Sequence, residues 1–282
     1  MKNLLVRSLS GIIYVALIVF CIWSGSAWFA VLSSVFTLLG IIEFQKITVP
    51  GPRTTAAKAA LIVDAAAALL LCNLATICLS SLLEWWMFYI PAMIIPAYFV
   101  CRYTLALYDR SEKALHNAAM SVFSLIYIAL PFGILNTLYV FYNAPHIRFL
   151  LLMMFIFIWL NDTGAYCAGS LFGKRRLFPR LSPKKSWEGF FGGMAFCIIA
   201  AVITAKFFTT GSMLAWIALS IMVCILSTWG DLFESLIKRT YAIKDSGNLI
   251  PGHGGILDRI DSLLFVSTGT AIFIMLANNY LL

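Results

Sequence analysis

Long apolar segments, separated by short charged ones, make up most of this sequence. Nine of them approach the ~20 residues needed to cross the hydrocarbon core of a bilayer. The expected spans are residues 8–24, 27–45, 60–83, 86–107, 118–141, 148–168, 189–209, 213–231 and 262–282. The composition agrees, because 62% of the residues are hydrophobic and only 11% are charged, against about 25% charged in soluble domains. The pattern therefore predicts an all-α, polytopic integral membrane protein with about nine transmembrane helices.

The basic residues lie almost entirely on one side of this arrangement. Of the 20 Lys and Arg residues, all except Arg148 and Lys206 fall at the N-terminus or in the even-numbered connections. The positive-inside rule then predicts a multi-pass protein of the cell inner (cytoplasmic) membrane, with a cytoplasmic N-terminus. Because the net charge of +8 is divided among membrane loops, nucleic acid is not an expected partner.

Residues that suggest chemistry concentrate in the second half of the chain. We expect an N-terminal transmembrane scaffold of about five helices over 1–145, and a catalytic region of about four helices with cytoplasmic loops over 146–282. Asp64 is a lone acid within the third span. Acids inside membranes mark functional sites or bond to neighbouring helices, and the sequence leaves both readings open. The seven cysteines lie in apolar segments without C-x-x-C spacing, so they indicate neither a disulfide framework nor a zinc site.

Four acids are expected to meet near the cytoplasmic surface. Asp162 and Asp231 lie at the cytoplasmic ends of the sixth and eighth spans, and Asp258 and Asp261 begin the ninth. Residues three apart share a helix face, and clustered carboxylates repel one another unless a cation neutralises them. Carboxylate oxygens suit Mg²⁺, so these four are the candidate metal ligands. The alternative is that Asp258 caps a helix and forms a salt bridge with Arg259.

The loops beside these acids contain candidate phosphate-binding groups. Lys238, Arg239 and Lys244 are cations suited to phosphate contacts, and the turn Pro-Gly-His-Gly-Gly over 251–255 exposes backbone N–H groups that would cradle a phosphate oxygen. His253 would either bond a phosphate or order the turn.

A second basic segment, Ser-Pro-Lys-Lys-Ser-Trp-Glu-Gly, spans residues 182–189. Ser182 followed by Pro183 is typical of a helix N-cap and first helical position. Lys184 and Lys185 would contact nucleotide phosphates or the acidic lipid headgroup. The alternative is a basic loop attracted to anionic lipid.

The segment from Ser235 to Asp261, S-x-x-K-R-x4-K-D-x-G-x2-I-P-x-H-G-G-x2-D-R-x-D, closely resembles the signature of phosphatidate cytidylyltransferases, also called CDP-diglyceride synthases. Asn-Asp-Thr-Gly-Ala-Tyr at 161–166, Phe-Gly-Lys at 172–174, the segment 182–189 and Gly-Asp-Leu-Phe-Glu-Ser at 230–235 are similar to that family too. The resemblance implies transfer of CMP from CTP to phosphatidate, with CDP-diacylglycerol and pyrophosphate as products. It also implies Mg²⁺, with K⁺ beside it, and a homodimer.

The resemblance assigns roles to residues of this sequence. Asp231, Asp258 and Asp261 would belong to the metal centre with Asp162 near it. The expected catalytic residues are Asp231, Asp258, Asp261, Lys238 and His253. The expected substrate-binding residues are Ser182, Lys184, Lys185, Ser235, Arg239, Lys244, Asp245, Gly254, Gly255 and Arg259.

Two other classes remain open at this point. A CTP-dependent polyprenol or lipid kinase has related architecture but transfers the γ-phosphate. A cation transporter would also gather intramembrane acids, without needing the cluster of lysines, arginines and glycines beside them.

Overall fold

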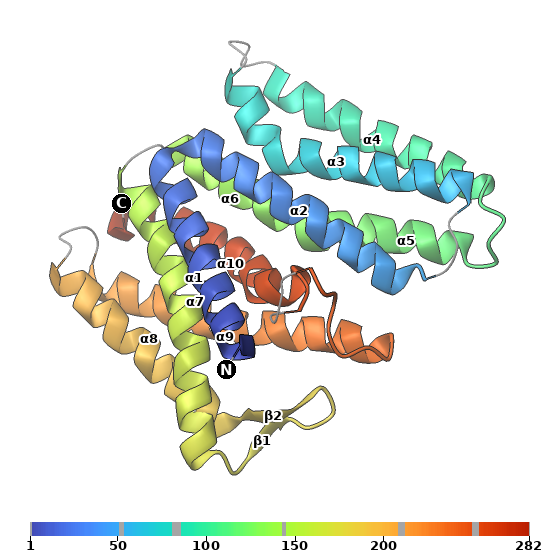
Figure 1. Ribbon diagram of the computed structural model, residues 1–282. Coiled ribbons are helices and arrows are strands. Elements are labelled where there is room, and N and C mark those ends of the chain that lie inside the picture. Colours follow the sequence, from blue (N-terminus) through green and yellow to red (C-terminus); the bar gives the residue numbers. More distant parts are fainter. Residues whose placement is uncertain are drawn as a thin grey trace. The chain divides into compact units, whose positions relative to one another are not determined.

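A computed structural model describes residues 2–50, 54–80, 86–142, 145–207, 212–249 and 254–281 (Figure 1). The helices are α1 (Lys2–Ser24), α2 (Ser26–Thr48), α3 (Thr55–Ser80), α4 (Trp86–Leu107), α5 (Ala114–Ser124), the π-helix η1 (Leu125–Ala129), α6 (Leu130–Tyr142), α7 (Pro145–Phe172), α8 (Trp187–Phe207), α9 (Met213–Thr240) and α10 (Leu257–Leu281). The chain forms two compact units. One comprises Met1–Tyr142 with Asp245–Leu257, and the other comprises Asn143–Lys244 with Asp258–Leu282.

The apolar segments predicted from the sequence do form helices, so the all-α polytopic class is confirmed. Among the described residues, seven helical segments are long and apolar enough to cross a membrane. Helices α1 and α4 contain shorter apolar stretches, Leu9–Ser24 and Met93–Leu107. The count of nine spans therefore stays a prediction.

In the first unit, α2 packs against α1, α3 and α6, and α3 packs against α4 and α6. Tyr139 Oη donates a hydrogen bond of 2.7 Å to the carbonyl of Ile22, which ties α6 to α1. The π-helix η1 ends two residues before Pro131. Because proline has no N–H and its ring crowds the carbonyl four residues earlier, a wider helical turn at this position relieves the crowding.

In the second unit, α7 packs closely against α8 because glycines line their contact. A Cβ atom at Gly193 would lie 2.7 Å from the carbonyl oxygen of Asn161, and one at Gly164 would lie 3.0 Å from the Cα of Gly193. Small residues allow such close approach of helices in membranes. Asn161 is buried and receives a hydrogen bond of 3.0 Å from Cys224 Sγ. This bond ties α7 to α9.

Between α7 and α8 the chain forms a hairpin of strands β1 (Arg176–Phe178) and β2 (Ser182–Ser186). The prediction that Ser182 caps a helix and Pro183 begins it is wrong, because both residues lie in β2. Ser186 is the residue that caps α8, since its Oγ accepts the N–H of Gly189 at 3.1 Å. Proline is tolerated in the strand because each strand of a two-stranded sheet has a free edge.

Candidate functional site

An open cavity of about 480 Å³ lies in the second unit between α7, the hairpin, α8 and α9. Its charged lining comes from Asp162 of α7, Lys184 and Lys185 of β2, and Asp231 of α9. Tyr166, Leu177 and Phe190 add apolar and aromatic surface. Three segments that are far apart in the sequence therefore supply acids and cations to one cavity.

A cluster of three carboxylates adjoins this cavity through Asp231. One carboxylate oxygen from each of Asp231, Glu234 and Asp261 lies within 4.8 Å of the others. Asp231 and Glu234 share a face of α9 because they are three residues apart, and Asp261 comes from the first turns of α10. Asp162 interacts electrostatically with Asp231 and Asp261. Of the four acids predicted to meet, Asp231 and Asp261 therefore belong to this cluster and Asp162 interacts with both, while Glu234 is an additional member.

Helices α9 and α10 approach closely enough to bring these acids together because residue 230 is glycine. A Cβ atom there would lie 2.6 Å from the carbonyl oxygen of Asp261 and 3.0 Å from the Cα of Ser262. Ser262 Oγ also donates a hydrogen bond of 3.1 Å to the carbonyl of Ser227. Gly230 thus allows the backbones of α9 and α10 to touch one residue before Asp231.

Two lysines partly neutralise the acids. Lys185 Nζ lies 2.5 Å from Asp231 Oδ2. Lys238 Nζ lies between two acids, 2.5 Å from Glu234 Oε2 and 2.7 Å from Asp258 Oδ1. The Lys238 group is mostly buried, with side-chain exposures of 14% for Lys238, 1% for Glu234 and 10% for Asp258. Burial of a charge is costly unless an opposite charge compensates it, which explains why a lysine lies between these two acids.

Asp258 therefore has a different environment from Asp261, although both begin α10. Its carboxylate pairs with Lys238, whereas the carboxylate of Asp261 belongs to the cluster of three. The role of Asp258 as a metal ligand stays a prediction.

The other predicted site residues fall into two groups. Ser182, Ser235, Arg239, Lys244 and Arg259 belong to the second unit with the cavity. Ser235 Oγ donates to Asp231 Oδ1 at 3.4 Å, and Arg239 donates to the carbonyls of Leu181 and Ile243 at 3.4 Å each. Asp245, Gly254 and Gly255 belong to the first unit, and His253 lies outside the described residues.

Glu234 is the site residue that the sequence analysis missed. It lies within the Gly-Asp-Leu-Phe-Glu-Ser motif at 230–235 and follows Asp231 by three residues. The helical spacing was the available signal, because residues at i and i+3 of a helix project from one face. Asp258 and Asp261 were recognised by that same spacing.

The donor set fits a divalent metal such as Mg²⁺. Three carboxylates supply hard oxygen ligands. Glu234 Oε1 is buried, and no hydrogen-bond donor from the part of the chain that the structure describes reaches it. A buried carboxylate oxygen without a donor is costly, and a metal ion would satisfy it.

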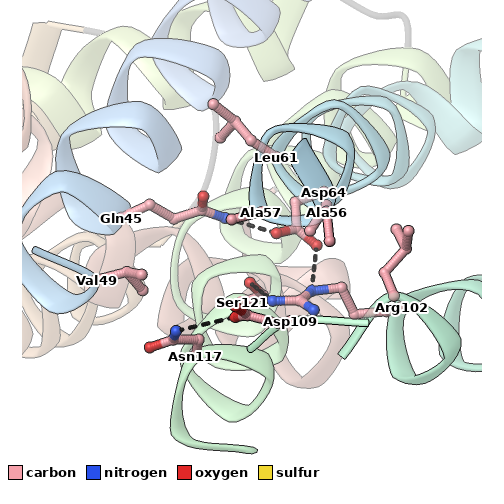
Figure 2. A pocket seen from close by; sticks show the side chains of 12 residues that line it. Gln45, Val49, Ala56, Ala57, Leu61, Asp64, Arg102, Asp109, Asn117 and Ser121 are labelled. Atoms are coloured by element: carbon pink, nitrogen blue, oxygen red, sulfur yellow. Dashed lines mark hydrogen bonds and ion pairs between the residues drawn. The ribbon is translucent and has the colours of Figure 1, made fainter. Parts of the chain in front are cut away.

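Asp64 belongs to a separate polar cluster in the first unit (Figure 2). Its carboxylate lies 3.3 Å from Arg102 Nε and accepts hydrogen bonds from Gln45 Nε2 at 2.7 Å and Tyr98 Oη at 2.9 Å. Arg102 Nη2 in turn donates to Ser121 Oγ at 3.0 Å. These contacts link α2, α3, α4 and α5, so the geometry favours the reading in which Asp64 bonds to neighbouring helices.

The chain is similar to several known proteins. The chain matches the cytidylyltransferase family over residues 5–277. It is 48% identical over 127 residues to a phosphatidate cytidylyltransferase of Haemophilus influenzae, covering 43% of this chain and 44% of that protein. It is 35% identical over 179 residues to a protein of the same name from Staphylococcus aureus strain COL, covering 63% of this chain and 66% of that protein. These matches span less than two thirds of the relatives' length.

Proposed function

Because this chain belongs to the cytidylyltransferase family, we propose that it transfers CMP from CTP to phosphatidate, producing CDP-diacylglycerol and pyrophosphate. The relatives described above carry the name phosphatidate cytidylyltransferase. The single observation that carries the proposal is the position of Asp231, which lines the cavity and also belongs to the cluster of three carboxylates. A phosphate-sized ligand in the cavity would therefore adjoin the candidate metal ligands.

The cavity suits a nucleoside triphosphate. Lys184 and Lys185 supply positive charge at its wall, and Tyr166 and Phe190 supply aromatic surface. Lysine binds phosphate as a compact point charge with three donors, so these two lysines would hold the triphosphate while the aromatic surface faces the nucleoside. Arg239, Lys244 and Arg259 would contact the remaining phosphate oxygens or the lipid headgroup.

Asp231, Glu234 and Asp261 would hold Mg²⁺, with Asp162 nearby. When bound, the ion would neutralise charge on the phosphates and the departing pyrophosphate. We extend the proposal to K⁺ beside the Mg²⁺, on the resemblance stated above. The contribution of the chain's own residues is to position these acids: Lys238 partly compensates the charge of the buried Glu234, and Gly230 allows α9 to contact α10.

The reaction needs positioning more than proton transfer. An oxygen of the phosphatidate phosphomonoester, already ionised near neutral pH, forms a bond to the α-phosphorus of CTP. The bond from that phosphorus to the oxygen bridging to the β-phosphorus breaks, and pyrophosphate carries the electron pair away. Lysines beside the triphosphate stabilise this charge because preorganised cations act where charge develops.

The lipid substrate and the basic residues both support a location in the inner membrane. A multi-pass membrane protein allows the acyl chains of phosphatidate to remain in the bilayer while its headgroup reaches the polar site. The distribution of basic residues supports an active site at the cytoplasmic face of the inner membrane, where CTP is available. A homodimer is part of the proposal through the family resemblance.

Labelled CTP tests the reaction directly. Purified protein with phosphatidate and Mg²⁺ should transfer label from the α-phosphate of CTP to the lipid and release label from the γ-phosphate as pyrophosphate. Diacylglycerol should not replace phosphatidate, because it lacks the ionised nucleophile. Lipid labelled from the γ-position would instead indicate a CTP-dependent lipid kinase. Folded protein that forms no CTP-dependent product would restore the cation transporter as the better reading.

A further inference from the structure

A buried acid of the N-terminal half contacts the loop that carries the second part of the signature. Glu43 lies on α2 and is only 6% exposed. Its Oε2 accepts the N–H of Leu257 at 2.9 Å and the hydroxyl of Ser246 at 3.2 Å. These partners are 214 and 203 residues away in sequence, and all three residues belong to the first compact unit.

The loop encloses the carboxylate of Glu43 from two sides. A Cβ atom at Gly247 would lie 2.5 Å from Glu43 Oε1, and one at Gly255 would lie 2.5 Å from Glu43 Oε2. Real Cβ contacts are essentially never below 3.0 Å, so any larger residue would displace the carboxylate. Close approach to the Glu43 carboxylate therefore explains why residues 247 and 255 are glycines.

The bond to Leu257 lies at the start of α10. Leu257 is the first residue of that helix, and the first N–H groups of a helix have no partner within it. A carboxylate at this position satisfies one of them and is favoured by the helix dipole. Asp258 and Asp261 follow within the next turn, so the start of the helix sets the direction in which both acids project.

We propose that Glu43 is a positioning residue for the acids of α10, and that the N-terminal half thereby contributes to metal binding. This inference rests on the proposed function, in which Asp261 is a metal ligand. In this proposal Glu43 acts without contacting the metal or the substrate. Partners that orient metal ligands typically contribute 10–100-fold in metal affinity, and Glu43 would act in this way through the backbone of α10.

The experiment compares Glu43→Ala and Glu43→Gln with the matched control Gln45→Ala. Gln45 is a buried polar residue on the same helix, but its bond goes to Asp64. We expect Glu43→Ala to raise the Mg²⁺ concentration for half-maximal activity about tenfold or more. Glu43→Gln retains one acceptor oxygen, so its Mg²⁺ midpoint should lie between those of Glu43→Ala and the unchanged protein. Gln45→Ala should stay within about twofold of the unchanged protein, even where it lowers the melting temperature.

Hydrogen–deuterium exchange supplies a readout that does not depend on activity. Glu43→Ala should accelerate exchange in peptides covering 245–262, because the Leu257 amide loses its acceptor. Exchange in the hairpin, residues 176–186, should not change. Unaltered exchange around Leu257 in both Glu43 variants, or a lower melting temperature with an unaltered Mg²⁺ midpoint, would overturn the proposal.

Non-additivity provides the sharpest test. Gly247→Ala should raise the Mg²⁺ concentration for half-maximal activity, because the added methyl group displaces the Glu43 carboxylate. It should have little further effect when Glu43 is already alanine. If Gly247→Ala changes the Mg²⁺ midpoint equally with Glu43 and with alanine at position 43, then Gly247 does not act through the Glu43 carboxylate. If the unchanged protein makes no CDP-diacylglycerol, the proposed function fails, while the exchange measurements still decide whether Glu43 holds the start of α10.

Discussion

Lys185 Nζ lies 2.5 Å from Asp231 Oδ2, and this contact joins the hairpin strand β2 to helix α9. The two side chains are 27% and 34% exposed, so the ion pair lies at the cavity surface. Asp231 is also one of the three clustered carboxylates. The lysine therefore occupies a position where a bound cation would compete with it for the same carboxylate.

Replacing Lys185 should therefore change the Mg²⁺ requirement and the KM for CTP in opposite directions. Lys185→Met removes the charge and keeps the side-chain length. It should lower the Mg²⁺ concentration for half-maximal activity about threefold, since a partly exposed ion pair contributes less than about 1 kcal/mol. It should raise the KM for CTP about tenfold, because a phosphate contact is lost. Steady-state kinetics at varied Mg²⁺ and CTP would measure both. A simple loss of kcat, with neither constant changed, would contradict the assignment.

Glu234 should be as important as the acids recognised from the sequence. Glu234→Gln and Asp261→Asn keep the side-chain size and remove one charge each. We expect each to reduce kcat/KM by about a hundredfold, comparable to the loss of a strong preorganised electrostatic contact. The exposed acid Glu112 gives a control, Glu112→Gln, that should remain fully active. Near-normal turnover of folded Glu234→Gln at limiting Mg²⁺ would remove Glu234 from the metal site.

Replacing Lys238 should mainly lower the stability of the fold. Lys238→Met leaves Glu234 and Asp258 without their shared cation, and breaking a buried ion pair costs about 3–5 kcal/mol. The melting temperature in detergent should fall by roughly 10 °C for a protein of this size. Combining it with Glu234→Gln removes one unpaired charge and should restore part of the loss. A double variant no more stable than Lys238→Met would argue against a stabilising ion pair between Lys238 and Glu234.

Asp64 should contribute to stability without contributing to catalysis. Asp64→Asn leaves Arg102 buried without its ion-pair partner, which should destabilise the protein by about 3 kcal/mol. The kcat per folded molecule and the Mg²⁺ midpoint should be unchanged at a temperature where the variant remains folded. A selective loss of kcat or of Mg²⁺ affinity would instead assign Asp64 to the reaction.

The orientation can be tested with single cysteines in a background lacking the seven natural ones. Arg180→Cys, in the hairpin turn, should resist an impermeant thiol reagent added outside intact cells. Lys206→Cys, expected on the other side, should react. Ready external labelling at residue 180 would reverse the predicted topology.

The sequence by itself determined the membrane class and the positions of most helices, and it predicted which acids would lie near one another. Helices form where apolar runs are long enough to span a bilayer, because lipid leaves backbone groups no other partners, and this requirement is local. The acids of α7, α9 and α10 were recognised because the topology predicts which helix ends share a membrane face. The signature segment supplied the family.

Only the tertiary structure decided how these residues pair. The ion pairs Lys238–Asp258 and Lys185–Asp231, and the bond from the first amide of α10 to Glu43, all join residues from different elements. Such contacts depend on helix crossings that single glycines permit, as at Gly230, and no pattern along one helix encodes the partner. The cap of α8 at Ser186 was misassigned for the same reason. Ser182 has the right local sequence, but pairing with β1 gives its backbone hydrogen bonds that a helix would otherwise supply.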